Sequence, residues 1–274
     1  MPSTIDSASP PGLLGALRNM PLFKQRQLAA YQRRFLENAS ENLFMGRFDS
    51  FEGALAQVPK HKPTGYDNAE SAKLAYTSQI TSWDYPVLFW LQRAFGDGLS
   101  SVFDLGGHVG IKYYAFKRTL PFPAGLRWTV CDVPAVVKEG AEIATHRDPT
   151  QQLGFTSDYA QASGHDILLA SGSLQYLPIR LVEILRTLPV KPRRILLNTT
   201  AAHTEETFYT VNSISTAFCA YRIQSWEELK EELKSAGYAR VDTWQNDGKP
   251  IGVPFERGGD LAYYAGGYFQ LQGG

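Results

Sequence analysis

The chain has 274 residues, of which 43% are apolar, and its 27 basic residues balance its 27 acidic residues at an isoelectric point near 7.0. This length and composition allow a sizeable core in one large domain, or in one domain with an extension. The charge balance argues against a general nucleic-acid binder or a membrane-surface binder.

No apolar run approaches the roughly 18 residues of a spanning helix, and the N-terminus lacks the basic and apolar regions of a signal peptide. Cys131 and Cys219 belong to no CxxC motif or Cys/His cluster, so we expect neither a disulfide framework nor a metal site. The sequence thus predicts a cytoplasmic protein with a small-molecule partner, no nucleic acid and no membrane. It leaves homodimer formation open.

The first third of the chain shows helical patterns. After a tail rich in Ser and Pro over 1–12, residues 13–39 have helical periodicity that is broken near Pro21, which predicts two helices. Residues 71–95 form a second helical block that ends at a GDG turn. We therefore expect a tail and a helical lid over 1–98.

From Ser100 onward, short apolar runs alternate with helical segments: SVFDL, VGIKYYAFKRTL, RWTVCDV, PAVVKEGAEIATH, HDILLAS, LPIRLVEILRTL and RRILLNT. This alternation is typical of an α/β domain with a doubly wound parallel sheet. A ligand-binding domain over 99–274 is the prediction.

The segment SWEELKEELKSAGY is an amphipathic helix, with Ser225 as N-cap, Glu228 at the third helical position and Gly237 as C-cap. Two strand-like segments follow it, YARVDTW and DLAYYAGGYFQLQ, separated by a long polar loop that contains NDGKP. They predict a hairpin that closes the sheet.

The stretch VFDLGGHVG, residues 102–110, is shaped like a nucleotide-binding loop. A dinucleotide fingerprint has the form GxGxxG, whereas LGGHVG lacks the first glycine. A carboxylate at Asp104 would repel pyrophosphate and attract an ammonium group. The ligand is therefore expected to be cationic at this end, unless Asp104 only forms a turn at the end of a strand.

S-adenosylmethionine satisfies these requirements, because it carries an α-ammonium, a sulfonium and an adenosine. Gly106, Gly107 and Gly110 would allow its close approach to the backbone, and Asp104 would help to hold its amino-acid end. Asp132 lies about 22 residues after Gly110, where the acid that binds ribose hydroxyls is expected. Asp132 could instead cap the helix that begins near Pro134.

The loop, the ribose acid, the AGY helix and the final hairpin occur here in the order found in class I S-adenosylmethionine-dependent methyltransferases, which the chain resembles from Leu99 to its end. Upstream, FMGRFDSFEGAL and GYDN resemble a bacterial family assigned as methyltransferases and found with surface-polysaccharide and natural-product genes. The resemblance implies a seven-stranded, mostly parallel Rossmann-like sheet with an antiparallel last strand. S-adenosylmethionine is then the implied cofactor, with no metal.

The resemblance also assigns roles after the third and fourth strands. It places Asp158 near the adenine amine, although an Asx turn is an equal alternative. It places SGSLQYLP, with Ser171, Ser173 and Tyr176, beside the sulfonium, where the Tyr176 ring would make a cation–π contact. Tyr176 could instead only pack beneath a helix that starts at Pro178. Other aromatic residues could enclose a dry site: Tyr66, Tyr76, Trp83, Tyr85, Tyr113 and Tyr114.

Two chemistries fit such a site. A methyltransferase commonly positions a base, but no firm base emerges from Asn198, Thr199, Thr200 and His203, and His108 and His203 could both be plain loop residues. The chain and its SLQYLP segment are also similar to bacterial azetidine-2-carboxylate synthases, which implies cyclisation of S-adenosylmethionine with Tyr176 facing the sulfonium. A domain that binds the ligand without turnover is a third hypothesis. The cyclase, which forms azetidine-2-carboxylate and 5′-methylthioadenosine, is the preferred interpretation, and a methyltransferase that acts on a small molecule in a natural-product or polysaccharide pathway is its alternative.

Overall fold

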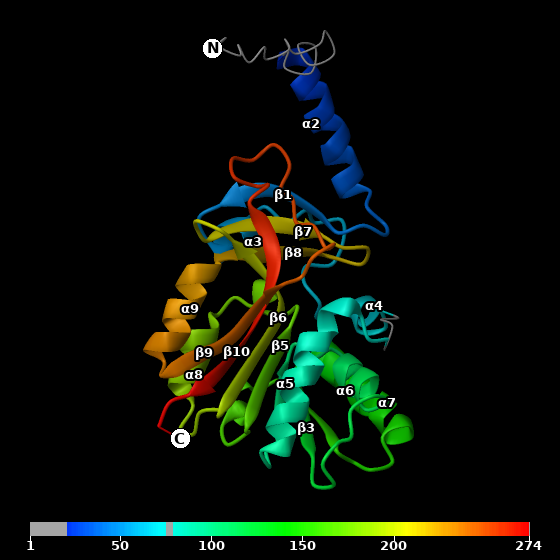
Figure 1. Cartoon of the computed structure of the whole chain (residues 1–274). Helices are drawn as coiled ribbons and strands as arrows, with labels where there is room; N and C mark the ends of the chain where they lie inside the picture. The colour runs from blue at the N-terminus through cyan, green and yellow to red at the C-terminus, as the bar shows by residue number, and fades with distance from the viewer. Residues whose placement is uncertain (1–20, 75–78, 274) are drawn as a thin grey trace, which may run out of the picture.

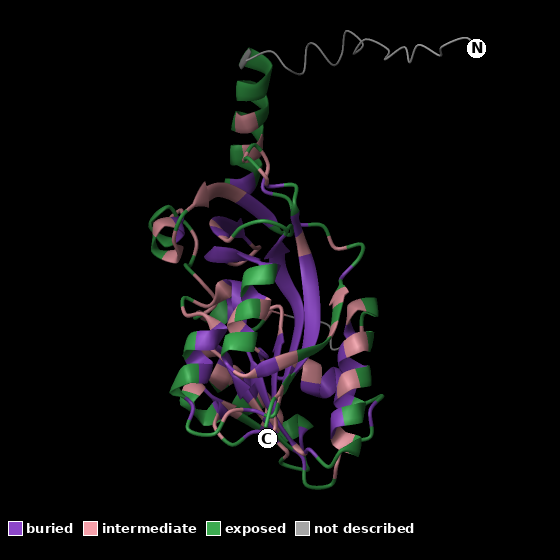
Figure 2. Cartoon of the chain, turned by 60° about the vertical axis from the view of Figure 1, so that its left-hand side comes forward, coloured by how far each residue is buried: buried purple, intermediate pink, exposed green. Residues whose placement is uncertain are grey.

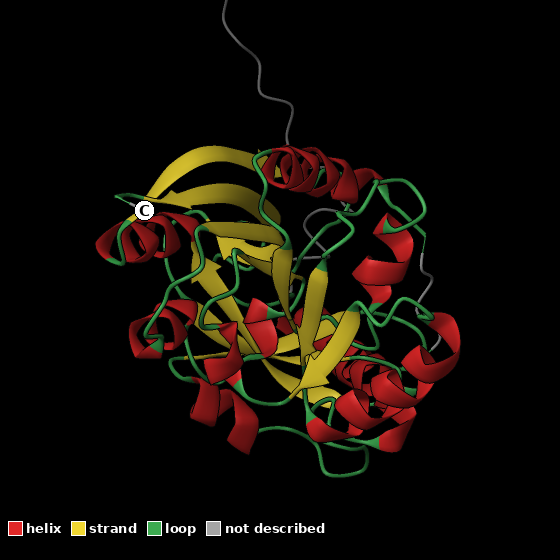
Figure 3. Ribbon diagram, turned by 90° about the horizontal axis from the view of Figure 1, so that it is seen from below, coloured by secondary structure: helices red, strands yellow, loops and turns green. Residues whose placement is uncertain are grey.

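The computed structural model describes residues 21–74 and 79–273 (Figure 1). Its strands form one ten-stranded sheet that is flanked by helices on both faces (Figure 3). The predicted helix before Pro21 lies outside the described residues, as does Tyr76. None of the helices in the described ranges is both long and apolar enough to cross a membrane.

Seven strands form the predicted Rossmann-like sheet, in the order β4-β3-β2-β5-β6-β10-β9. Strands β2 to β6 pair in parallel, and β10 lies antiparallel between β6 and β9. The predicted antiparallel last strand and closing hairpin are therefore confirmed. The strand bounds are β2 Ser101–Leu105, β3 Arg127–Cys131, β4 Leu153–Thr156, β5 Ile167–Ser171, β6 Arg194–His203, β9 Tyr238–Gln245 and β10 Ala262–Leu271.

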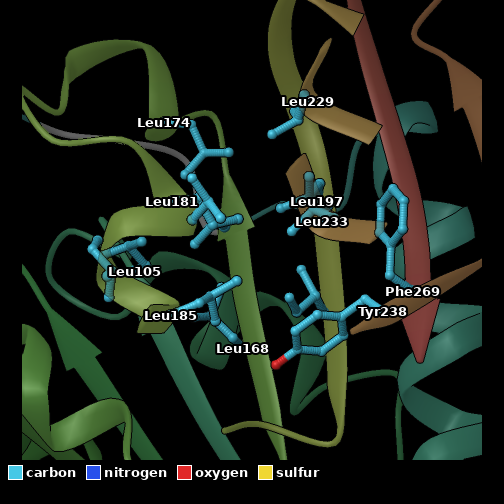
Figure 4. Packing of buried hydrophobic residues seen from close by; sticks show 14 of the residues in the cluster. Leu105, Leu168, Leu174, Leu181, Leu185, Leu197, Leu229, Leu233, Tyr238 and Phe269 are labelled. Atoms are coloured by element: carbon cyan, nitrogen blue, oxygen red, sulfur yellow. The ribbon is translucent and has the colours of Figure 1, made fainter. Parts of the chain in front are cut away.

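Apolar side chains alternate between the two faces of this sheet, as the twofold period of a strand requires. Leu168 and Leu197 pack with α8 (Leu181–Thr187) and α9 (Trp226–Ser235) on one face (Figure 4). On the other face, Leu169 and Leu196 pack with α5 (Tyr85–Gly96) and α6 (Ile111–Phe116). The strands at the centre are buried on both sides (Figure 2).

Three further strands, which the sequence analysis did not predict, extend the sheet beyond β6. They are β1 (Leu43–Phe48), β7 (Phe208–Ser213) and β8 (Phe218–Ser225), in the order β1-β7-β8-β6. All residues of β8 are buried, and β6 is ten residues long, so that its last two residues pair with the end of β8. The first third of the chain thus supplies a strand as well as helices.

The N-terminal helices differ in part from the prediction. Helix α2 (Pro21–Leu36) begins at Pro21 and projects from the body of the molecule (Figure 1). The block expected over 71–95 is not one helix, because α4 (Ala69–Ala72) ends early and α5 is preceded by the short 3₁₀ helix η1 (Ser82–Asp84). The remaining N-terminal helix is α3 (Phe51–Ala56), and α7 (Pro134–Arg147) follows β3.

The caps of α9 show why this helix was predictable. The Ser225 hydroxyl accepts a hydrogen bond from the Glu228 N–H at 3.3 Å, as the sequence predicts. At the other end Ala236 is the C-cap, and Gly237 follows it with φ +96°. Glycine is common at this position because it adopts the left-handed conformation without a steric cost.

Candidate functional site

The glycine-rich loop lies where the strand order of the sheet reverses. Strand β2 has β3 on one side and β5 on the other, so the segments after β2 and β5 leave the same edge of the sheet next to each other. Ligands of doubly wound folds bind at this kind of switch point. A Cβ added to Gly106 would lie only 2.2 Å from the Ser173 Cβ, so the two segments are in close contact.

Replacing Gly106 by alanine should disrupt the loop, because the new methyl group would overlap Ser173 and because φ at this position is +72°. We expect at least a tenfold loss of ligand affinity and a lower melting temperature in a thermal unfolding scan. Gly154→Ala in β4 is the matched control, since a Cβ there meets nothing within 4 Å. Equal affinities of the two variants would contradict this role of Gly106.

Asp104 lies beneath the loop and not at its open surface. It is 1% exposed, its Oδ2 accepts a hydrogen bond from Trp128 Nε1 at 3.1 Å, and a Cβ on Gly107 would lie 2.5 Å from that same oxygen. Burial raises the pKa of Asp104 to about 7, although the Trp128 hydrogen bond and Lys112 act in the opposite direction. The carboxyl therefore titrates near neutral pH, directly under the loop.

Asp132 connects the end of β3 to the loop. Its two oxygens accept hydrogen bonds from the N–H groups of Val133 at 2.8 Å and His108 at 2.9 Å. The alternative reading as helix cap does not hold, because Val133 occupies the N-cap position of α7 and receives no side-chain cap. A carboxylate has about four acceptor sites on its two oxygens, so Asp132 can still accept further hydrogen bonds from a ligand.

His108 connects the loop to the N-terminal segment. It is only 7% exposed, so it does not point into solvent, and its Nε2 donates to the Ser71 carbonyl oxygen at 3.0 Å. Its φ of +54° is unusual for a residue with a side chain. Burial lowers the pKa of its imidazole. Sequence reasoning missed this contact, since no local pattern relates His108 to α4.

The residues after β4 and β5 have defined local roles. Asp158 is exposed and its carboxylate accepts a hydrogen bond from the Ala160 N–H at 2.9 Å, which is the Asx-type alternative. The Ser173 hydroxyl donates to the Leu105 carbonyl oxygen and so fastens the segment after β5 to β2. The Ser171 hydroxyl accepts a weak hydrogen bond from Asn198 at 3.4 Å.

Tyr176 belongs to a group of four tyrosines, Tyr66, Tyr176, Tyr221 and Tyr264, which we call the tyrosine cluster. The Tyr176 ring contacts the rings of Tyr66 and Tyr221 edge to face, at centroid distances of 5.1 and 5.0 Å. Its hydroxyl donates to Asn212 at 3.1 Å, and the hydroxyls of Tyr221 and Tyr264 lie 2.9 Å apart. The helix after Tyr176 starts at Leu181 and not at Pro178.

The other aromatic residues suggested by the sequence lie in different environments. Tyr85 is 64% exposed, whereas Tyr113 and Tyr114 pack in the core between α6 and the sheet. Tyr66 joins the tyrosine cluster, and Trp83 donates its indole N–H to the Asp247 carbonyl oxygen at 2.7 Å. Tyr221 and Tyr264 were missed, because each lies in a strand where an aromatic residue signals only burial.

Two polar residues of β6, Asn198 and His203, are engaged in the fold, whereas the buried Thr200 hydroxyl has no hydrogen-bond partner among the described residues. His203 Nδ1 accepts from the N–H groups of Glu205 and Glu206, so its Nε2 carries the proton and donates to the Gly258 carbonyl oxygen at 3.0 Å. Asn198 accepts from the side chains of Trp244 and Asn246. His203 is therefore a structural histidine, and it offers no free nitrogen to a reactant. Within residues 21–74 and 79–273, no group of three or more His, Cys, Asp or Glu side chains is arranged to hold a metal.

Comparisons with known proteins return solved structures only. No family model and no curated protein matches the chain. The solved structures include 1,6-didemethyltoxoflavin-N1-methyltransferase from Burkholderia thailandensis, at 19% identity over 69% of this chain and 78% of that one, with a TM-score of 0.44. They also include the CcbJ methyltransferase from Streptomyces caelestis, at 13% identity over 75% and 97% of the two chains (TM-score 0.47), and OxaC bound to S-adenosylhomocysteine and oxaline, at 16% over 76% and 52% (TM-score 0.49).

Proposed function

We propose that this chain binds S-adenosylmethionine at the carboxyl ends of β2, β3 and β5 and consumes it in small-molecule chemistry. One observation carries the proposal: two carboxyl groups, Asp104 and Asp132, contact the backbone of a glycine-rich loop at the switch point of the sheet. Such a loop is unsuited to pyrophosphate. It suits a ligand whose ammonium binds Asp104 and whose ribose hydroxyls bind Asp132.

Intramolecular cyclisation is the first candidate chemistry that we propose for this site. The α-amine of the ligand would lose a proton and form a bond to its own γ-carbon, and the bond from that carbon to sulfur would break with its electron pair going to sulfur. The products are azetidine-2-carboxylate and 5′-methylthioadenosine. This reaction needs no acceptor site and no resident base, in agreement with the structural role of His203. The methionine arm of the ligand must fold so that its amine can reach the γ-carbon, and the tyrosine cluster would hold it in that conformation.

Methyl transfer to a small molecule is the second candidate, and it is the activity named for two of the solved structures above. An acceptor atom would take the methyl group, S-adenosylhomocysteine would leave, and the acceptor would lose a proton. Supporting this candidate is the resemblance of the loop, the AGY helix and the terminal hairpin to class I methyltransferases. A base would have to come from the acceptor, or from side chains other than His203.

Incubating the full chain with S-adenosylmethionine alone, and following the products by mass spectrometry, separates the two candidates. Azetidine-2-carboxylate with 5′-methylthioadenosine, formed faster than in a control without protein, would establish cyclisation. Bound but unchanged ligand would exclude cyclisation and leave methyl transfer or binding without turnover, which are separated by whether S-adenosylhomocysteine forms once acceptors are added. Absence of ligand binding in calorimetry would refute both. The Gly106→Ala variant is the matched negative control.

A further inference from the structure

Lys249 is a cation held among aromatic rings between β9 and β10. Its Nζ lies 4.5 Å from the ring centroid of Tyr264 and 5.4 Å from that of Trp83. The loop that carries it is fixed to η1 by the hydrogen bond from Trp83 to Asp247. None of the ion pairs found in the described part of the chain includes Lys249.

A second cation, Lys112, pairs with the same short helix η1 that Lys249 contacts, and it belongs to the glycine-rich loop side of the site. It is in the first turn of α6, two residues after Gly110, and its Nζ is 2.5 Å from Asp84 Oδ1. The other oxygen of Asp84 accepts from the N–H and the hydroxyl of Thr81, both at 3.0 Å. Asp84 therefore pairs with Lys112, and no ion pair of the described residues joins it to Lys249.

The two lysines and Asp84 act on one another electrostatically. Burial lowers the pKa of Lys249, the charge of Lys112 lowers it further, and Asp84 acts in the opposite direction. Lys112 also stabilises the ionised form of Asp104 under the loop. An anionic group placed near both lysines would relieve this repulsion.

Lys249 also lies between the tyrosine cluster and the short helix η1. Through Tyr264 it contacts the tyrosine cluster, whose Tyr221 links Tyr264 to Tyr176. Through Trp83 it contacts η1, whose Asp84 pairs with Lys112 in the helix that follows the loop. Lys249 thus contacts both the cluster that contains Tyr176 and the segment that pairs with the helix after the loop.

We propose that Lys249, supported by Lys112, binds the carboxylate of the α-amino-acid end of the ligand. This inference rests on the proposed function. An α-amino acid carries an ammonium and a carboxylate on one carbon, and the site offers to match them a buried acid, Asp104, and a cation, Lys249, that takes part in none of the ion pairs of the described residues. Holding the carboxylate fixes the direction of the amine, which either chemistry requires: cyclisation for attack, methyl transfer for keeping the amine away from the acceptor.

The test compares three ligands by calorimetry with the full chain: S-adenosylmethionine, its decarboxylated analogue, and 5′-methylthioadenosine, which lacks the amino-acid carbons altogether. We expect the wild type to bind S-adenosylmethionine about tenfold more tightly than the decarboxylated analogue, a difference of about 1.4 kcal/mol. Lys249→Met should remove that preference and leave the affinities for the other two ligands unchanged. Lys249→Arg, which keeps the charge, should retain most of it.

Lys60→Met is the control variant, because Lys60 is exposed and lies in the segment after α3. A Lys249→Met protein that still prefers S-adenosylmethionine tenfold would overturn the inference and leave the proposed function intact. An equal loss of affinity for all three ligands would also overturn the inference, because it indicates general damage to the site. Failure of the wild type to bind any of the three would instead refute the proposed function, and with it the inference.

Discussion

The Asp104→Asn variant is expected to bind S-adenosylmethionine at least tenfold more weakly than the wild type and, at pH 8, to be more stable. The carboxyl is 1% exposed and its pKa is raised to about 7, so its ionisation is costly in the folded chain. The usual pKa is 3.8, and the difference corresponds to up to about 4 kcal/mol. An amide of the same shape removes this cost and also removes the charge that attracts the ligand ammonium.

The sign of the pH dependence follows from the raised pKa. The unfolded chain ionises this carboxyl near pH 3.8 and the folded chain only near 7, so the wild type loses stability relative to the variant as pH rises through that window. Urea unfolding should show similar free energies of unfolding at pH 4 and the largest difference at pH 8. A variant that is less stable than the wild type at pH 8 would contradict this account.

Ligand binding offers an independent check on Asp104. Between pH 5.5 and 7 the wild type should gain about tenfold in affinity as the carboxyl ionises, whereas the variant should show no such gain. This range lies below the titration of a free α-amine, whose pKa is near 7.7–8.0. A parallel pH profile in the two proteins would mean that Asp104 does not face the ligand charge.

The second large effect concerns Tyr176, the member of the tyrosine cluster that follows β5. Tyr176→Phe should keep turnover within about threefold, because the ring and its contacts with Tyr66 and Tyr221 remain. Tyr176→Ala should lower kcat/KM about 30-fold or more, since a desolvated cation–π contact contributes roughly 2 kcal/mol or more. The measurement is the rate of S-adenosylmethionine consumption for each variant.

Loss of packing must be separated from loss of the cation–π contact. Truncating a large aromatic residue costs about 3–5 kcal/mol of stability when it is buried. Tyr263→Ala is the control, because Tyr263 is partly buried on the α8/α9 face of the sheet and outside the tyrosine cluster. Equal turnover in Tyr176→Ala and the wild type would refute the role of Tyr176, and an equal loss in Tyr263→Ala would ascribe the effect to packing.

The parallel part of the fold was predictable because its signals are local. The strand and helix patterns after Ser100, the cap at Ser225 and the final hairpin each depend on neighbouring residues. Strand β1 lacks a clean alternation, since Gly46 has φ +79° and the register shifts between Met45 and Phe48. The length of β6 depends on partners in β8 and β10 that lie far along the chain.

The candidate site also has a part that was predictable from the sequence and a part that was not. The positions of Asp104, Gly106 and Asp132 follow from the spacing of one strand, loop and helix unit, and the structure places all three around the loop. The contact of His108 with Ser71, the tyrosine cluster and the position of Lys249 join segments that are distant in sequence. No periodicity encodes such contacts, because they arise only when the sheet has assembled.

The length of β6, which has ten residues, affects how the protein unfolds. Its first half pairs with β5, its last two residues pair with β8, and β10 pairs with it from Arg194 to His203, so one continuous backbone belongs to both the parallel sheet and the antiparallel extension. Melting the extension frees the end of a strand on which the parallel core also depends. Both parts should therefore unfold in a single cooperative transition, with the amide protons of β6 among the last to exchange with solvent.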